Sequence, residues 1–339
     1  MSEIRFSFIV PVYNLEQNIE KTLTTIFATG LKNAELIVVD DGSFDDTLKV
    51  INNTVEQYNI SCRVISQKNS GVSVARNVGI DAARGDYIIF IDGDDTCDAE
   101  ILNIAEKLCE NHPDMVVWRF NYVDGEKCYV SQERFDKDEY SKNEFLEQLL
   151  KGKFCIRIGS FAVKKSIIAN RGICFTKDCS IAEDVEFIYK LVLSSEFIRV
   201  TNESLYNYIK REGSAINQYD LRRFQAPIAI RRIYDFALNN CFDELDEFCV
   251  DYLKNGLFLT HAMYSFDSCC SHIKGIMSCK NFINEYIGQY KDVENLICDT
   301  VKDIKYNPLQ FSNRRLLIFK QSRKIYAYYK FCCHIVGKD

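Results

Sequence analysis

Short strand-like runs alternate with stretches of helical periodicity over the first hundred residues of the chain. Residues 6–11, 35–40 and 64–65 form runs of the length of buried strands. After the first run, apolar side chains recur every three or four residues from Leu15 to Phe27, as they do along one face of a helix. This β-α-β-α-β order predicts an α/β fold in which helices flank a mainly parallel sheet.

The pattern changes twice further along the chain. Residues 116–122 read as another strand, and residues 145–150 and 183–193 have helical periodicity. From about residue 225 only amphipathic helices are expected. Their ranges are 228–238, 248–259 and 283–297. We therefore expect two domains: residues 1–220, which contain the sheet, and residues 221–339, which are mostly helical.

The composition limits the kinds of function that the chain can have. Its 339 residues are 47% hydrophobic and 27% charged, which is typical of a globular protein. The formal net charge is -6 and the pI is about 5.5, whereas binding to duplex nucleic acid needs a basic surface. The expected partners therefore do not include nucleic acid.

Neither membrane spans nor disulfides are expected. The apolar run 6–12 is too short to cross a bilayer and contains Pro11. No secretory leader is recognised, so the fifteen cysteines are expected to be reduced thiols of a cytoplasmic protein. Cys270, His272 and Cys279 lie close together, but their spacing fits no zinc motif, which favours ordinary thiols over a zinc site.

Acidic residues follow two of the expected strands. Asp40-Asp41-Gly42-Ser43 ends one strand, and Asp92-Gly93-Asp94-Asp95 follows the apolar run 87–91. Clustered carboxylates repel one another unless a cation offsets their charge, and oxygen ligands suit Mg²⁺ or Mn²⁺. A solvated turn at residues 92–95 and a helix cap at residues 40–43 remain the alternatives. Because ligands bind beyond the carboxyl ends of parallel strands, both turns are candidates for one site.

Five segments of the sequence carry a resemblance to a known family. They are Ile9-Val10-Pro11-Val12-Tyr13-Asn14, Val38-Val39-Asp40-Asp41-Gly42-Ser43, Asn69-Ser70-Gly71 with Ala75-Arg76-Asn77 and Gly79, Asp92-Gly93-Asp94-Asp95, and Glu183-Asp184. In this order they resemble the inverting glycosyltransferase family 2, whose members have the GT-A fold. The resemblance covers roughly residues 4–215. It implies transfer of a sugar from a nucleotide diphosphate to an acceptor hydroxyl.

The resemblance assigns donor-binding roles to several residues. Asp41 would read the N3 proton of uracil, which implies a UDP-linked donor, and Pro11 and Tyr13 would flank the base. Arg76 is similar to a family arginine that lies near the nucleotide. Asp92 would lie near the ribose.

The same resemblance implies a divalent cation, Mn²⁺ or Mg²⁺. Asp94 would hold the cation that bridges the diphosphate, and Asp95 would support it from behind. The physical chemistry agrees, because a cation stabilises the charge that develops on the leaving diphosphate.

Glu183 and Asp184 begin the expected helix 183–193. By resemblance, Asp184 is the general base that removes the proton of the acceptor hydroxyl, and Glu183 supports it. The alternative is structural, because a carboxylate at a helix N-terminus is stabilised by the helix dipole and by free N–H groups.

A weaker match follows the helix. The segment 206–214 is similar to a family segment in which a basic residue and a serine approach the diphosphate, which makes Arg211 and Ser214 candidates for donor binding. A charged surface loop without such a role is the alternative.

The last stretch, residues 314–338, is basic and amphipathic. It contains no acidic residue, so it could lie on an anionic membrane surface near a lipid-linked acceptor. Alternatively, its apolar face packs on the preceding helices.

The favoured function is that of an inverting hexosyltransferase that passes a sugar from a UDP-sugar to a saccharide, in synthesis of a bacterial surface polysaccharide. A dehydrogenase is disfavoured because the first strand leads into Val12-Tyr13-Asn14 and not into a G-x-G-x-x-G turn. A sugar nucleotidyltransferase would need a glycine-rich N-terminal phosphate loop. A degenerate domain that binds carbohydrate or serves in an assembly is the non-enzymatic alternative, and retention of Asp41, Asp92, Asp94 and Asp184 argues against it.

Overall fold

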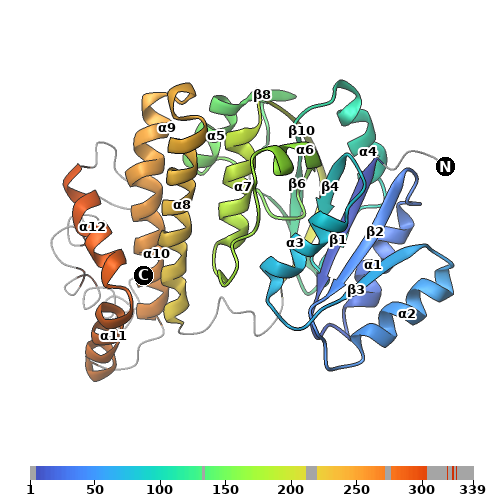
Figure 1. Cartoon of the computed structure of the whole chain (residues 1–339), viewed down its shortest axis with the longest axis horizontal. Coiled ribbons are helices and arrows are strands. Elements are labelled where there is room, and N and C mark those ends of the chain that lie inside the picture. Colours follow the sequence, from blue (N-terminus) through green and yellow to red (C-terminus); the bar gives the residue numbers. More distant parts are fainter. Residues whose placement is uncertain are drawn as a thin grey trace. The chain divides into compact units, whose positions relative to one another are not determined.

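The computed structural model describes residues 5–131, 134–210, 220–271 and 276–303, together with residues 319, 323 and 326. The chain divides into two compact units, Met1–Glu212 and Gly213–Asp339, each with a core of its own. Figure 1 shows the sheet in the first unit and helices in the second.

A parallel half-sheet forms the N-terminal part of the first unit (Figure 1). Its strands, in spatial order, are β3 (Cys62–Ser66), β2 (Ala34–Asp40), β1 (Phe6–Val12) and β4 (Tyr87–Phe90). The helices that connect them are α1 (Ile19–Ala28), α2 (Thr47–Tyr58) and α3 (Val72–Ala82). The chain moves outward from β1 to β3 and then returns to place β4 on the other side of β1. Such a reversal creates a crevice at the carboxyl ends of the two central strands.

The rest of the sheet is mixed. β9 (Phe161–Lys164) runs antiparallel between β4 and β6 (Met115–Asp124), and β10 (Phe197–Ile209) runs parallel to β6. The short strands are β5 (Thr96–Cys97), β7 (Lys127–Val130) and β8 (Glu139–Ser141). The helices are α4 (Ile101–Leu108), α5 (Lys142–Leu150), α6 (Lys165–Asn170) and α7 (Glu183–Ser194). A helix-flanked sheet followed by a helical region is the expected α/β, GT-A-like fold class, which is thereby confirmed.

Alternation along β1 explains why both faces of the sheet are covered. Phe8 and Val10 are fully buried in the core formed with α1, α2 and α4. Ile9 points to the opposite face, where α3 packs. Gly79 lets α3 approach closely, because a Cβ atom there would lie 2.3 Å from the Ile9 side chain. The helix α3 is therefore held tightly against the central strands.

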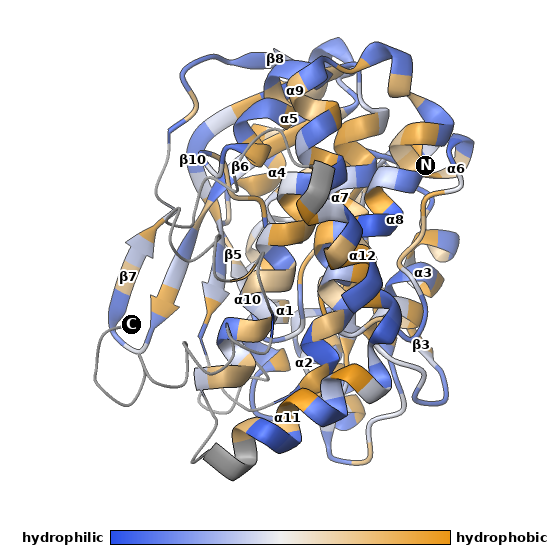
Figure 2. Ribbon diagram, turned by 90° about the vertical axis from the view of Figure 1, so that its left-hand side faces the viewer, coloured by the Kyte–Doolittle hydropathy of each residue, from blue (hydrophilic) through white to orange (hydrophobic). Residues whose placement is uncertain are grey.

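The second unit consists of helices with apolar and polar faces (Figure 2). They are α8 (Gln225–Asn240), α9 (Glu247–Asp251), α10 (Leu257–Ser271), α11 (Ile276–Gln289) and α12 (Lys291–Asp303). The expectation of one helix over residues 283–297 was wrong, because the chain breaks at Tyr290 between α11 and α12. Another difference is a π-helical turn, Tyr252–Gly256, between α9 and α10. The ring of Phe224 anchors this unit, with the Tyr286 ring at 4.5 Å and the Phe266 ring at 5.0 Å between centroids.

Among the described helices, none is long and apolar enough to span a bilayer. The basic segment 314–338 lies outside the described residues except for residues 319, 323 and 326. His272 of the candidate zinc cluster also lies outside them, whereas Cys270 and Cys279 are buried.

Candidate active site

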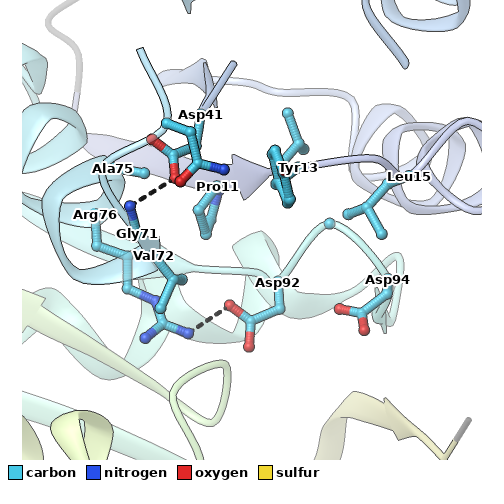
Figure 3. A pocket seen from close by; sticks show the side chains of 13 residues that line it. Pro11, Tyr13, Leu15, Asp41, Gly71, Val72, Ala75, Arg76, Asp92 and Asp94 are labelled. Atoms are coloured by element: carbon cyan, nitrogen blue, oxygen red, sulfur yellow. Dashed lines mark hydrogen bonds and ion pairs between the residues drawn. The ribbon is translucent and has the colours of Figure 1, made fainter. Parts of the chain in front are cut away.

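A pocket of about 410 Å³ opens at the carboxyl ends of β1 and β4, where the strand order reverses (Figure 3). Figure 3 shows Asp41 on one side of it, and Asp92 and Asp94 on another. Six residues that the sequence singles out line this one pocket: Pro11, Tyr13, Asp41, Arg76, Asp92 and Asp94.

Asp41 follows β2, and its carboxylate is held by three donors. Its Oδ1 accepts hydrogen bonds from Gln67 Nε2 at 2.7 Å and from the Ser70 backbone N–H at 2.8 Å. Its Oδ2 accepts one from the Gly71 N–H at 2.8 Å. A carboxylate offers about four acceptor positions, so Oδ2 retains one for a ligand. The carboxylate is thus fixed in place and can still accept a hydrogen bond from a ligand.

The loops beside Asp41 are fixed by a close backbone approach. Gly42 has φ +74°, and a Cβ atom there would lie 2.8 Å from the backbone nitrogen of Asn69. Asn14, which also has positive φ, accepts a hydrogen bond from the Phe44 N–H at its side chain and donates one from its backbone N–H to Ser43 Oγ. These contacts join the loop after β1 to the loop after β2. Tyr13 remains 42% exposed at the pocket mouth, where its ring face is available to a ligand.

Arg76 lies on α3 and is the cation that balances the acidic residues. Its guanidinium is 4% exposed, donates to Asp92 at 2.8 Å, and pairs with Glu183 at 3.3 Å. Burial opposes its charge, but attraction to Asp92 and Glu183 raises the pKa of Arg76 above its usual value. Its Nε is buried and has no hydrogen-bond partner. Arg76 therefore ties the turn after β4 to the start of α7.

The loop before α7 packs against the Arg76 side chain through Phe175. The side chain of Asn77 donates to the Phe175 carbonyl oxygen and accepts from its N–H, both at 2.9 Å. The Phe175 ring then lies 5.1 Å from the Arg76 guanidinium carbon and stacks on Phe187 at 3.8 Å. A cation over an aromatic face is stabilised by the ring quadrupole, so this stack favours the charged guanidinium at its position.

The first turn of α7 brings Glu183 and Asp184 to the same region. Asp184 is half-buried, and its Oδ1 accepts a hydrogen bond from the Val185 N–H at 2.8 Å. Burial and the charge of Asp184 raise the pKa of Glu183, against the opposing attraction of Arg76. Asp184 follows Glu183, which pairs with Arg76 of the pocket, but Asp184 itself is not among the residues that line the pocket.

Asp94 and Asp95 point in different directions. Asp94 lines the pocket, whereas Asp95 is 1% exposed and accepts hydrogen bonds from the Ile209 N–H at 2.7 Å and from the Tyr206 hydroxyl. Burial, with the negative charge of Asp92, raises the pKa of Asp95 to about 7. Asp95 therefore fixes the turn after β4 to the end of β10.

We expect Asp95 to make stability depend on pH. Its pKa is about 7 in the folded chain and about 3.8 for an aspartate in water, so the folded state binds the proton more tightly. The free energy of unfolding should fall as pH rises from about 4 to about 7, by at most about 4 kcal/mol. Asp95→Asn can keep both hydrogen bonds and should flatten this dependence. Urea unfolding in EDTA between pH 4 and pH 8 measures it, and equal slopes for the two proteins would refute it.

The pocket fits a divalent cation only together with a ligand. Within the described ranges, no three His, Cys, Asp or Glu side chains are grouped so as to hold a metal by themselves. Mg²⁺ is often bound through one or two carboxylates, water and substrate phosphates. Asp94 on the pocket wall could supply one such carboxylate.

Two groups of residues complete the comparison with the sequence. Arg211 and Ser214 lie outside the described residues. Gln67 and Arg157 were missed by sequence reasoning, and no motif marks either of them. Gln67 holds Asp41, and the Arg157 guanidinium carbon lies 4.8 Å from the Tyr208 ring centroid.

Comparison with known families identifies the first unit. The family described as Glycosyl transferase family 2 matches residues 7–172, which include the whole pocket. The first unit, which contains the matched residues, belongs to this family. The resemblance carried by the five sequence segments is thereby confirmed.

Two relatives with similar sequences come from bacteria. An uncharacterized glycosyltransferase, EpsJ of Bacillus subtilis (strain 168), is 29% identical over 253 residues, which are 71% of this chain and 73% of EpsJ. Poly(ribitol-phosphate) beta-N-acetylglucosaminyltransferase TarS of Staphylococcus aureus is 27% identical over 215 residues. These residues are 62% of this chain but only 36% of TarS.

Solved structures show the same fold. The crystal structure of S. aureus TarS 1–349 in complex with UDP-GlcNAc matches with a TM-score of 0.71 and 22% identity, covering 98% of this chain and 92% of that one. Mannosyltransferase PcManGT from Pyrobaculum calidifontis, in complex with GDP-Man and Mn²⁺, matches with a TM-score of 0.52 and 15% identity, covering 98% and 88%. At these identities the likeness establishes the fold alone.

Proposed function

We propose that this chain transfers a sugar from a UDP-sugar to a hydroxyl of a saccharide acceptor with inversion at the anomeric carbon. The observation that carries the proposal is the convergence of Asp41, Arg76, Asp92 and Asp94 on one pocket beside the N-terminus of α7. Membership of family 2 supports the reaction class, and the UDP-GlcNAc bound by TarS supports a UDP-linked donor.

In the proposed donor complex, Asp41 Oδ2 accepts a hydrogen bond from the N3–H group of uracil at the acceptor position that Gly71 leaves free. Tyr13 and Pro11 cover the faces of the base, and Asp92, oriented by Arg76, accepts from a ribose hydroxyl. Arg211 and Ser214 would approach the diphosphate. Because Asp41 is already oriented by three donors, it loses little freedom when a base binds.

We assign Mn²⁺ or Mg²⁺ as the cofactor, held by Asp94 and the donor diphosphate. When bound, such a cation stabilises the negative charge that develops on the leaving UDP. Asp95, fixed to β10, sets the backbone of the turn that presents Asp94.

The proposed chemistry is a single displacement. Asp184 takes the proton of the acceptor hydroxyl while that oxygen forms a bond to the anomeric carbon. The bond from this carbon to the diphosphate oxygen breaks, and its electron pair leaves with UDP. Glu183, paired with Arg76, keeps the first turn of α7 near the pocket. One displacement from the far face inverts the configuration.

The setting that we propose is synthesis of a bacterial surface polysaccharide in the cytoplasm, with residues 1–220 catalytic and residues 221–339 contacting the acceptor. The name of TarS, a bacterial relative, gives the polymer poly(ribitol-phosphate) and supports a polymeric acceptor in a bacterium. The basic segment 314–338 would hold the enzyme at the inner membrane face when the acceptor is lipid-linked.

Release of UDP from a panel of UDP-sugars tests the proposal. The purified chain is incubated with each donor, Mn²⁺ and an extract of surface saccharides, and UDP is quantified against reactions without acceptor. We expect acceptor-dependent release from at least one donor. Binding of donor without any turnover would instead favour a degenerate binding subunit, and formation of nucleoside triphosphate from pyrophosphate would favour a nucleotidyltransferase.

A further inference from the structure

A second pocket lies in the first unit beside the hairpin of β6 and β7. Figure 2 labels both strands. It has a volume of about 460 Å³, which is in the range of small-ligand sites. Its walls come from β6, β7, the residues after the hairpin, and the segment after α5. It shares no lining residue with the pocket at the ends of β1 and β4, which we call the donor pocket after its proposed function.

Aromatic side chains form much of this second pocket. Phe135 and Phe154 are 8% exposed and contact each other with ring centroids 4.8 Å apart, so they form its floor. Tyr129 is 54% exposed, on a strand whose residues are all exposed. Flat aromatic faces beside polar groups suit the apolar faces of sugar rings.

The charges in this pocket are positive. Arg119 and Lys153 line it, and no acidic residue is found among the lining residues that the structure describes. Burial lowers the pKa of Arg119, and the charge of nearby Arg134 lowers it further. The Arg119 guanidinium donates to the Ser131 carbonyl oxygen, and its Nε is buried without a partner. Like charges gathered in this way are stabilised when an anion binds between them.

A chain of contacts connects this pocket to the candidate base. Tyr122, which lines the pocket, accepts a hydrogen bond from Arg157 Nη2 at 3.2 Å. Arg157 also lies over the Tyr208 ring. Burial opposes the charge of Arg157, but the hydrogen bond to Tyr122 and the charge of Asp184 raise its pKa. Arg157 therefore contacts a residue of the second pocket and is also within electrostatic reach of Asp184.

We propose that the second pocket is an acceptor subsite for a saccharide that bears an anionic substituent, a carboxylate or a phosphate. Arg119 and Lys153 bind the anionic group, and Tyr129 and Tyr122 contact the sugar ring. This inference rests on the proposed glycosyl transfer for the meaning of acceptor, but the binding itself can be measured without turnover.

Calorimetric titration of the full chain with glucose 6-phosphate, glucuronate, glucose and inorganic phosphate tests the subsite. We expect at least one sugar anion to bind about tenfold more tightly than glucose and than phosphate, in a salt-sensitive manner. The two sugar anions separate a phosphate-bearing from a carboxylate-bearing acceptor. Saturating UDP should not displace them, since the two pockets share no residue.

Variants locate the binding. Lys153→Ala and Arg119→Gln should each lower the affinity for the sugar anion about tenfold, because each removes one charge-assisted hydrogen bond. Lys127→Ala removes a charge from the same hairpin outside the pocket and should change nothing. UDP affinity, measured on the same preparations, shows that each variant is folded and tests the donor site separately.

Equal affinity for glucose, equal affinity for inorganic phosphate, or unchanged binding by Lys153→Ala would overturn the subsite. If the unaltered chain bound the sugar anion but not UDP, the proposed donor site would be wrong and the subsite would stand.

Discussion

Asp184→Asn is expected to lower the turnover of the enzyme by about 10² to 10⁴, because general-base catalysis contributes that much to rate. Asparagine cannot take the proton of the acceptor hydroxyl, but its side-chain oxygen can still accept the Val185 N–H bond that Asp184 accepts. The fold of α7 should therefore survive. UDP affinity should remain within about twofold, since Asp184 does not line the donor pocket.

Initial rates at saturating donor, together with calorimetry of UDP, measure the two effects separately. Glu196→Gln is a matched control, since it removes an exposed carboxylate just beyond the opposite end of α7. Glu196 pairs with Lys142, whose side chain is only 5% exposed, so the free energy of unfolding of this control is measured beside its turnover. Near-normal turnover by Asp184→Asn would remove Asp184 from the mechanism and would leave it as a helix N-terminal residue.

Asp94→Asn is expected to lower turnover by about 10² to 10³, the usual loss when one group that stabilises transition-state charge is removed. In this variant the amide replaces the proposed carboxylate ligand of the cation. UDP should still bind through Asp41, but addition of Mn²⁺ should strengthen binding far less than it does in the unaltered chain.

The distinguishing readout is the ratio of UDP affinities with Mn²⁺ and with EDTA. Asp98→Asn is the control, because Asp98 lies four residues further along and caps the Glu100 N–H outside the pocket. If Asp94→Asn kept the full response to Mn²⁺, Asp94 would not be a metal ligand.

The positions of the donor-site residues could be predicted because they sit at strand ends. Asp41 and Asp92 follow buried strands, and parallel strands bring their carboxyl ends to one edge of the sheet. The strand order that puts β1 between β2 and β4 then places both beside Pro11. Hydrophobic periodicity fixes which residues end each strand, whereas the donor-binding roles of Asp41 and Asp92 were implied by the resemblance to family 2.

Side-chain directions within the turns could not be predicted in the same way. Asp94 and Asp95 are neighbours in a polar turn, yet Asp95 faces inward because Tyr206 and Ile209 supply donors from a strand more than a hundred residues away. Arg157 is similar, since its environment is made by Tyr122 and Tyr208 on two strands. Such contacts depend on the tertiary fold and leave no local pattern in the sequence.

Helix ends in the second unit were also beyond the sequence pattern. Periodicity continues through residues 283–297, but the helix ends at Gln289 and a new one begins at Lys291. The Tyr286 hydroxyl donates to Glu294 at 3.0 Å across this break. One long helix and two short helices satisfy the same period, so periodicity alone does not decide between them. The hydrogen bond from Tyr286 to Glu294 stabilises the two short helices.

The central claim is that the pocket at the ends of β1 and β4 binds a uridine diphosphate with a divalent cation. Calorimetric titration of UDP into the purified chain, once with Mn²⁺ and once with EDTA, tests it most directly. The account predicts micromolar binding with Mn²⁺ that is at least about tenfold weaker in EDTA and that Asp41→Asn weakens. Absence of binding in both buffers, or equal binding in both, would contradict it.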